Sequence, residues 1–183
     1  MSASAEKFMS SNEFLNWAEA QEGRWELHGG VAVAIAPERI IHSQCKGRVY
    51  RSLSAAIERS GAPCEALPDG PGVRIAEDTV FEPDALVYCG SQPRSIGLEV
   101  SNPIIVVEVL SPTTAALDHG AKLTGYFSLS SVVHYLIVDA DRRVVIHHKR
   151  GQGDVIETRI VAEGQLRLQP PGLEISVAEL FPA

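Results

Sequence analysis

Two carboxylates, each at the end of a short apolar run, are the side chains of this sequence best placed to do chemistry. Asp84 begins the run ALVY at 85–88, and Glu108 ends the run IIVV at 104–107. Both runs have the length and the β-branched or aromatic content of buried strands. An ionised side chain beside a buried strand is costly unless it is paired or holds a metal. If the two strands are neighbours, the carboxylates reach one point, where hard oxygen ligands suit Mg²⁺ or Mn²⁺.

A lysine in the following segment could complete such a site. Lys122 lies in a helix expected to begin at residue 113 or 114, so its second or third turn passes over the strands. From there the ammonium could orient a water molecule or offset charge on a phosphate. The alternatives without a metal are a salt bridge between Glu108 and Lys122, and a turn hydrogen bond for Asp84. Tyr126, one turn beyond the lysine, is interpreted as core packing.

Three further side chains could support the site. Glu26 alternates with Leu27 before a Gly-Gly hairpin signal, and it is either a further metal ligand or water-positioning group, or an exposed hairpin carboxylate. His42, near the start of the next helix, is either a base or phosphate contact, or a cap or surface residue. Asp118 precedes Lys122 by four residues, so the pair shares a helix face and can fix the direction of the lysine.

Basic side chains gather on a helix expected over 40–60. Its apolar residues fall four apart along one stripe, which is typical of a helix with one buried face. It carries four cations against a single acid, Glu58, within an acidic chain. Such a charge run is either a solvated helix face or a local phosphate-facing patch. The four cations are Lys46, Arg48, Arg51 and Arg59.

The rest of the chain predicts a single α/β (α+β) domain over 1–183, with 1–9 as a flexible tail. A helix over 11–21 follows a capping-box spacing, and a hairpin follows that helix. Short connections join every expected element, so no domain boundary is needed. Further strands are expected at 64–67, 73–76, 79–81, 132–138, 144–148, 157–161 and 166–168, with the last two as edge strands and a closing helical turn over 176–181.

Composition excludes several classes of function. The net charge of −7 argues against general electrostatic adhesion to nucleic acid, although a local basic groove is compatible with it. No apolar run is long enough for a membrane span. The first residues lack the apolar core of a signal peptide. Three cysteines without metal-binding spacing predict reduced thiols in a cytoplasmic protein. They are Cys45, Cys64 and Cys89.

An ordered set of residues from 83 to 126 resembles the PD-(D/E)XK nuclease superfamily. Within that superfamily, the chain is similar to the Uma-type branch of bacterial putative restriction endonucleases. WELHGG resembles the hairpin segment of that branch, His42 matches a histidine that opens its next helix, and YLIVD at 135–139 resembles a strand end. The similarity covers about 24–181. The set comprises Pro83-Asp84, Glu108-Val109-Leu110-Ser111-Pro112-Thr113, Asp118, Lys122 and Tyr126.

The resemblance implies a restriction-endonuclease-like core, with a mixed β-sheet flanked by helices. It also implies Mg²⁺-dependent hydrolysis of a DNA phosphodiester. Asp84 and Glu108 would hold the metal, with the Val109 carbonyl as a further ligand. The third motif position, normally lysine, is Leu110, so the resemblance implies that Lys122 takes that place from the following helix.

A second function, from another class, is a catalytically silent module that keeps this fold to bind protein or nucleic acid. The negative charge and the missing motif lysine favour this reading, whereas the intact Asp84, Glu108 and Lys122 favour the nuclease. An enzyme with one site per chain cuts both strands of DNA most simply as a two-fold dimer, so a homodimer is expected.

Overall fold

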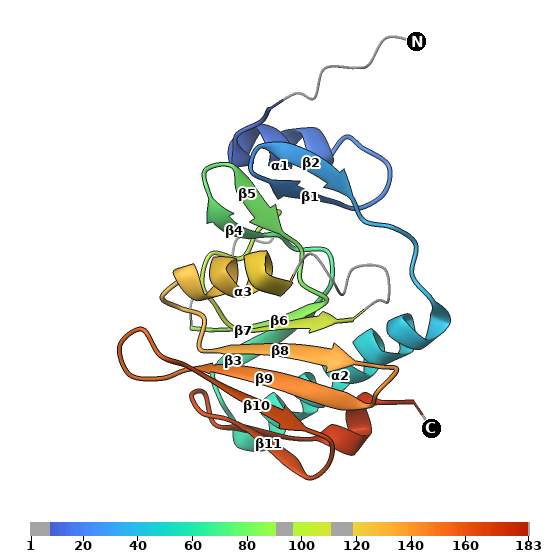
Figure 1. Cartoon of the computed structure of the whole chain (residues 1–183), viewed down its shortest axis with the longest axis vertical. Coiled ribbons are helices and arrows are strands. Elements are labelled where there is room, and N and C mark those ends of the chain that lie inside the picture. Colours follow the sequence, from blue (N-terminus) through green and yellow to red (C-terminus); the bar gives the residue numbers. More distant parts are fainter. Residues whose placement is uncertain (1–7, 91–96, 111–118, 183) are drawn as a thin grey trace.

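A computed structural model describes residues 8–90, 97–110 and 119–182. Its centre is a six-stranded mixed sheet in the order β10-β9-β8-β7-β6-β3, in which only β7 and β8 run parallel (Figure 1). A four-stranded sheet in the order β2-β1-β5-β4 lies at one end, and β11 pairs with β12. The strands are β1 Trp25–His28, β2 Val31–Ala34, β3 Cys64–Pro68, β4 Val73–Ala76, β5 Thr79–Phe81, β6 Ala85–Cys89, β7 Pro103–Val109, β8 His134–Asp139, β9 Val144–Arg150, β10 Ile156–Val161, β11 Gln165–Leu168 and β12 Leu173–Ser176.

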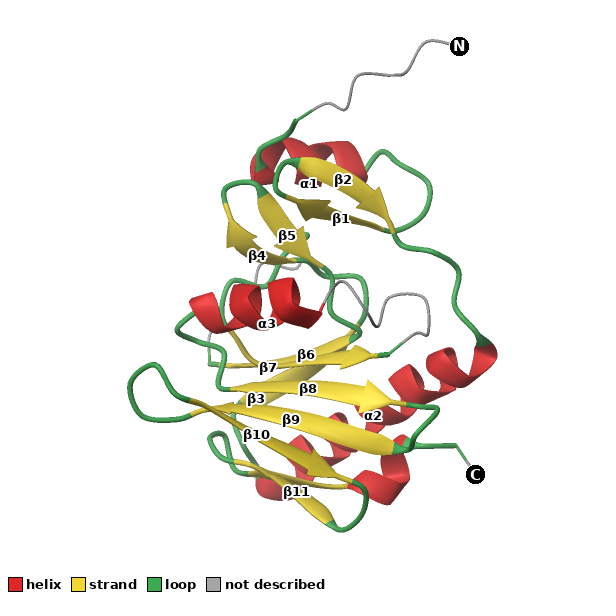
Figure 2. Ribbon diagram, in the orientation of Figure 1, coloured by secondary structure: helices red, strands yellow, loops and turns green. Residues whose placement is uncertain are grey.

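Helices cover the two faces of the six-stranded sheet (Figure 2). On one face, α2 packs with the β11–β12 pair over alternate residues of β6, β7 and β8. On the other face, α3 packs over the residues between them and also meets the four-stranded sheet. The helices are α1 Ser11–Ala18, α2 Ile40–Ser60 and α3 His119–Ser128, with a 3₁₀ turn over Val177–Leu180. The described helices include none that is long and apolar enough to cross a membrane.

The local patterns of residues 10–61 are confirmed, except that α1 ends at Ala18 and not at residue 21. Ser10 and Glu13 form the capping box of α1, and β1 and β2 form the predicted hairpin. In α2 the apolar stripe is buried, and the helix ends at Gly61 in the left-handed conformation with φ 65°. Glycine tolerates this conformation because it has no Cβ. The hairpin and α2 are therefore present where the sequence predicted them.

The two central apolar runs are neighbours, as predicted. β6 and β7 are antiparallel, with Ala85 opposite Val107. One step further along this register, Asp84 and Glu108 occupy facing positions at the same end of the sheet. The predicted start of α3 at 113–114 lies outside the described residues, and the helix is described from His119 onwards.

The end of the chain matches the prediction in part. The expected strand at 166–168 and the closing helical turn are present as β11 and the 3₁₀ turn, but β11 pairs with β12, a strand that the sequence did not predict. Leu166 and Leu168 are buried in the core under α2. The run Pro170-Pro171-Gly172 lies in the turn between β11 and β12. Proline and glycine commonly mark such turns.

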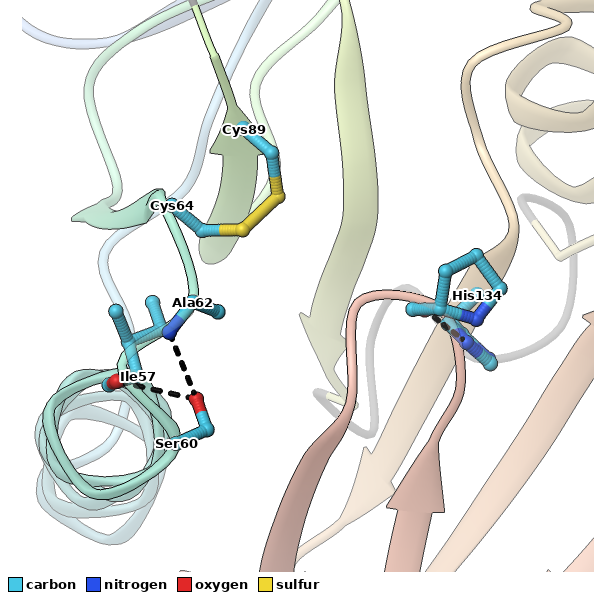
Figure 3. The surroundings of a disulfide bond; sticks show 7 residues. Ile57, Ser60, Ala62, Cys64, Cys89 and His134 are labelled. Carbon is cyan, nitrogen blue, oxygen red and sulfur yellow. Dashed lines mark hydrogen bonds between the residues drawn. A yellow bond between two sulfur atoms is a disulfide. The ribbon is translucent and has the colours of Figure 1, made fainter.

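The prediction of three reduced thiols is wrong for two of them. Cys64 on β3 and Cys89 on β6 face each other in the antiparallel register and form a disulfide (Figure 3). Their partnership depends on which strands are neighbours, which the spacing of cysteines in a sequence does not reveal. Cys45 is a free cysteine buried in α2.

We expect the disulfide to stabilise the fold by closing a loop of 25 residues in the unfolded chain. Loop-closure entropy gives a loss of about 3 kcal/mol in the free energy of unfolding on reduction. Urea unfolding with and without a reducing agent measures it. The double variant Cys64→Ser/Cys89→Ser is the control and should not respond to the reductant; equal stability of the oxidised and reduced parent would contradict the expectation.

Candidate active site

Asp84 ties the start of β6 to the end of β7. Its backbone N–H donates to the Val107 carbonyl at 2.9 Å, and its Oδ2 accepts from the Val109 N–H at 2.6 Å. The residue is 8 % exposed. The carboxylate is therefore held at the end of the sheet by backbone groups of the strand that carries Glu108.

Glu108 points to the α3 face of the sheet, as the alternation along β7 requires. Its Oε1 accepts from Lys122 Nζ at 3.1 Å and from the Tyr126 hydroxyl at 2.7 Å. Lysine and tyrosine lie one turn apart on α3, so both side chains reach the same carboxylate. Lys122 extends back over the strand, as predicted. It also forms the salt bridge with Glu108 that was the alternative to a metal site.

Tyr126 has a polar role that the sequence interpretation missed. Its ring is fully buried and packs against Phe81 and Tyr135, which is the predicted core packing. Its hydroxyl additionally donates to Glu108. Buried tyrosine hydroxyls usually form a hydrogen bond. The position of Tyr126, one turn after Lys122, was therefore the signal in the sequence for its contact with the site.

Glu26 reaches the same cluster from the hairpin. It is 6 % exposed, so the alternative of an exposed hairpin carboxylate is wrong. Its Oε1 accepts from Lys122 Nζ at 2.9 Å and from the Glu82 N–H at 2.8 Å. Its Oε2 lies 2.9 Å from His28 Nε2. Lys122 therefore bridges Glu26 and Glu108, two carboxylates from different sheets.

Lys46 was assigned only to a basic helix, but the structure brings it to Asp84. Its ammonium lies 2.7 Å from Asp84 Oδ1, 2.9 Å from Glu38 and 3.5 Å from Asp69. A charge run in a sequence does not reveal which cation turns inward. The four basic residues of α2 do not form one patch, since Arg59 donates to the Glu174 carbonyl.

Arg24 and Glu82 form a further ion pair beside the cluster. Arg24 Nε donates to Glu82 at 2.6 Å, and its guanidinium also lies 2.8 Å from Asp69. Neither residue carried a signal in the sequence. Because Asp69 also lies near Lys46, the pair connects to the Asp84 side of the cluster.

His42 is buried at 1 % exposure, which excludes a surface role. Both ring nitrogens lack a hydrogen-bond partner among the residues described here. It precedes Lys46 by four positions on α2, so the two side chains share a helix face. Its predicted role as a base or phosphate contact stays a prediction. Asp118 lies outside the described residues.

The site carries more negative charge than its cations balance. Burial raises the pKa of Glu108 to about 7, against the lowering effect of Lys122, and the charges of Asp84 and Glu26 raise it further. Burial also raises the pKa of Asp84, although Lys46 opposes this effect. For Glu26, burial raises the pKa, but the His28 hydrogen bond and the Lys122 charge outweigh burial and leave it lowered.

This imbalance bears on whether the site suits a metal. Across residues 8–90, 97–110 and 119–182, no group of three or more His, Cys, Asp or Glu side chains is arranged to hold an ion. The facing pair Asp84 and Glu108 is a set of hard oxygen donors with raised pKa values, to which added positive charge is favourable. Mg²⁺ commonly binds through one or two carboxylates and keeps several waters. The residues present therefore fit such an ion.

The mixed sheet, the flanking helices and the acidic pair at the sheet end define a restriction-endonuclease-like fold. A family model described as "Putative restriction endonuclease", Uma2, matches residues 11–179. The chain belongs to this family.

The chain is also similar to other sequences and to a solved structure. Two uncharacterized proteins of Synechocystis are 27 % and 25 % identical to the chain, covering 94 % and 86 % of it and 91 % and 90 % of their own lengths. A crystal structure from Anabaena variabilis, described as a "putative nuclease", superposes with a TM-score of 0.74 at 18 % identity. It covers 94 % of this chain and 97 % of its own. At this identity the structural likeness shows the fold.

The raised pKa of Glu108 gives a pH-dependent prediction. The folded-state pKa of about 7 lies above the ordinary value of 4.5, so protonation of Glu108 favours the folded state. This stabilisation is full below pH 4.5 and is lost as the pH rises through about 7. Glu108→Gln keeps a neutral group, so its stability relative to the parent should increase over this range, by on the order of a few kcal/mol.

Urea unfolding of both proteins in a chelating buffer, at steps between pH 4.5 and 8, measures the difference. Glu157→Gln, on the exposed strand β10, is the matched control. A difference between Glu108→Gln and the parent that does not change with pH would contradict the expectation.

Proposed function

We propose that this protein is a metal-dependent endonuclease that hydrolyses DNA phosphodiester bonds. The observation that carries the proposal is the facing pair Asp84 and Glu108 at one end of the sheet, with Lys122 reaching Glu108 from α3. Membership of a family described as "Putative restriction endonuclease" supports the same reaction and substrate. DNA would be the partner. The cytoplasmic location stays a prediction without the support of reduced thiols, because Cys64 and Cys89 form a disulfide.

Asp84 and Glu108 would hold Mg²⁺ or Mn²⁺, with the Val109 carbonyl as a further oxygen ligand. When bound, the ion would supply charge neutralisation at the phosphate and an activated water. Within residues 8–90, 97–110 and 119–182, Lys122 and Tyr126 both contact Glu108 at Oε1, so its other oxygen is the natural ligand. The Tyr126 hydroxyl holds the carboxylate in this orientation.

Lys122 would stabilise the negative charge that develops on the phosphate in the transition state. Its ammonium is positioned by two carboxylates, Glu26 and Glu108, on separate sheets. Glu26 stays ionised because its pKa is lowered, so it can hold the lysine in place and accept a hydrogen bond from water. This division of work makes Lys122 a catalytic group and Glu26 a positioning group.

Substitutions in the site should separate metal binding from catalysis. Lys122→Ala should abolish cleavage of supercoiled plasmid in Mg²⁺ while leaving Mn²⁺ affinity nearly intact, because lysine acts on the transition state. Asp84→Asn and Glu108→Gln should remove both cleavage and Mn²⁺ binding. Gel assays and calorimetric titration measure these outcomes.

Lys149→Ala, at the opposite end of the main sheet, is the control and should cut like the parent. Cleavage by Lys122→Ala at the parent rate would contradict its role. A parent that never cuts DNA in Mg²⁺ or Mn²⁺ would favour the second function, a catalytically silent module for protein or nucleic-acid binding. One observation favours that module: in the described residues, both acids already have lysine partners.

A two-fold arrangement would let two copies of the site act on the two strands of a duplex. We therefore expect a homodimer. Light scattering over a range of protein concentrations, with and without a short DNA duplex, should give twice the mass of the 19.7 kDa chain. A monomer at every concentration, with or without DNA, would contradict the expectation.

A further inference from the structure

The candidate site has two lysines, and they come from opposite faces of the main sheet. Lys122 belongs to α3, whereas Lys46 belongs to α2, which packs on the other face. The ammonium of Lys46 lies 2.7 Å from Asp84 Oδ1, and its side chain is 12 % exposed. The contact is therefore between a largely buried cation and a largely buried carboxylate.

We propose that Lys46 is an internal competitor for the metal site: its ammonium holds the oxygen of Asp84 that a divalent cation must take. This inference rests on the metal-dependent function proposed above. In this proposal Lys46 of α2 controls metal binding, whereas Lys122 of α3 acts in catalysis.

The contacts of Asp84 identify which oxygen is contested. Oδ2 accepts the Val109 N–H at 2.6 Å and so joins β6 to β7. Oδ1 is the oxygen that Lys46 holds. An ammonium and a divalent ion on one buried carboxylate oxygen would repel each other strongly, because the surroundings screen charge weakly. A cation that binds Asp84 through Oδ1 must therefore move Lys46 aside.

Lys46 can leave Asp84 without becoming an unpaired buried charge, which would be strongly destabilising. Glu38 lies at 3.0 Å through Oε1 and 2.9 Å through Oε2, and Asp69 Oδ2 lies at 3.5 Å. These two carboxylates come from outside the Asp84–Glu108 pair.

Calorimetric titration of Mn²⁺ into the full chain tests the competition. A charge within a few ångströms changes the cation affinity of a carboxylate by about tenfold or more, so Lys46→Met should bind Mn²⁺ at least about tenfold more tightly than the parent. Glu38→Gln removes an alternative partner of the ammonium and should bind Mn²⁺ a few-fold more weakly, by the same reasoning. Lys149→Met, the same substitution at the far end of the sheet, should match the parent. Circular dichroism establishes that each variant folds.

Unchanged or weaker Mn²⁺ binding by Lys46→Met would overturn the inference, because a lysine that only shapes Asp84 would lower the affinity when removed. Should Lys46→Met not fold, equal or tighter binding by Glu38→Gln would overturn it instead. If the parent binds no Mn²⁺ while Lys46→Met does, the competition is supported and the proposed function of the parent fails. If neither the parent nor Lys46→Met binds Mn²⁺, the inference and the proposed function both fail. If the parent binds Mn²⁺ and cuts DNA but Lys46→Met binds Mn²⁺ no more tightly, the inference alone fails.

Discussion

The arrangement around the end of β6 and β7 depends on one constraint: carboxylates that are buried together need cations. Asp84 pairs with Lys46, and Glu82 pairs with Arg24. Glu108 and Glu26 both pair with Lys122. Removing one partner from such a pair leaves an uncompensated buried charge, which is far more destabilising than loss of a surface pair. These contacts therefore restrict where α2, α3 and the hairpin can lie.

Because the carboxylates paired with Lys122 lie in different sheets, the charge network also connects these sheets. Glu26 is on β1 of the four-stranded sheet, Glu108 is on β7 of the six-stranded sheet, and Lys122 of α3 joins them. The apolar core under α3 continues across the same junction through Phe81 and Tyr126. A change of charge at Glu108 therefore alters electrostatic interactions in both sheets.

The sequence predicted what depends on neighbouring residues. Apolar spacing predicted α2, the glycine pair predicted the hairpin, and two apolar runs with terminal acids predicted the facing pair Asp84 and Glu108. What it missed depends on contacts between distant segments. The inward turn of Lys46 and the bond of Tyr126 to Glu108 are decided by tertiary packing, and so are the pairings of β12 and of the cysteines, which leave no local pattern.

The distribution of charge within the site is uneven, and this decides where further positive charge has most effect. Glu26 has both Lys122 and His28 close to it, and its pKa is lowered. Glu108 shares the same lysine, yet its pKa is raised, because the effect of burial outweighs the charge of Lys122 and the charges of Asp84 and Glu26 raise the pKa further. Burial raises the pKa of Asp84 as well, although the charge of Lys46 opposes this effect. The raised pKa values of Asp84 and Glu108 mean that added positive charge would be favourable beside these two carboxylates, which is where the proposed metal would bind.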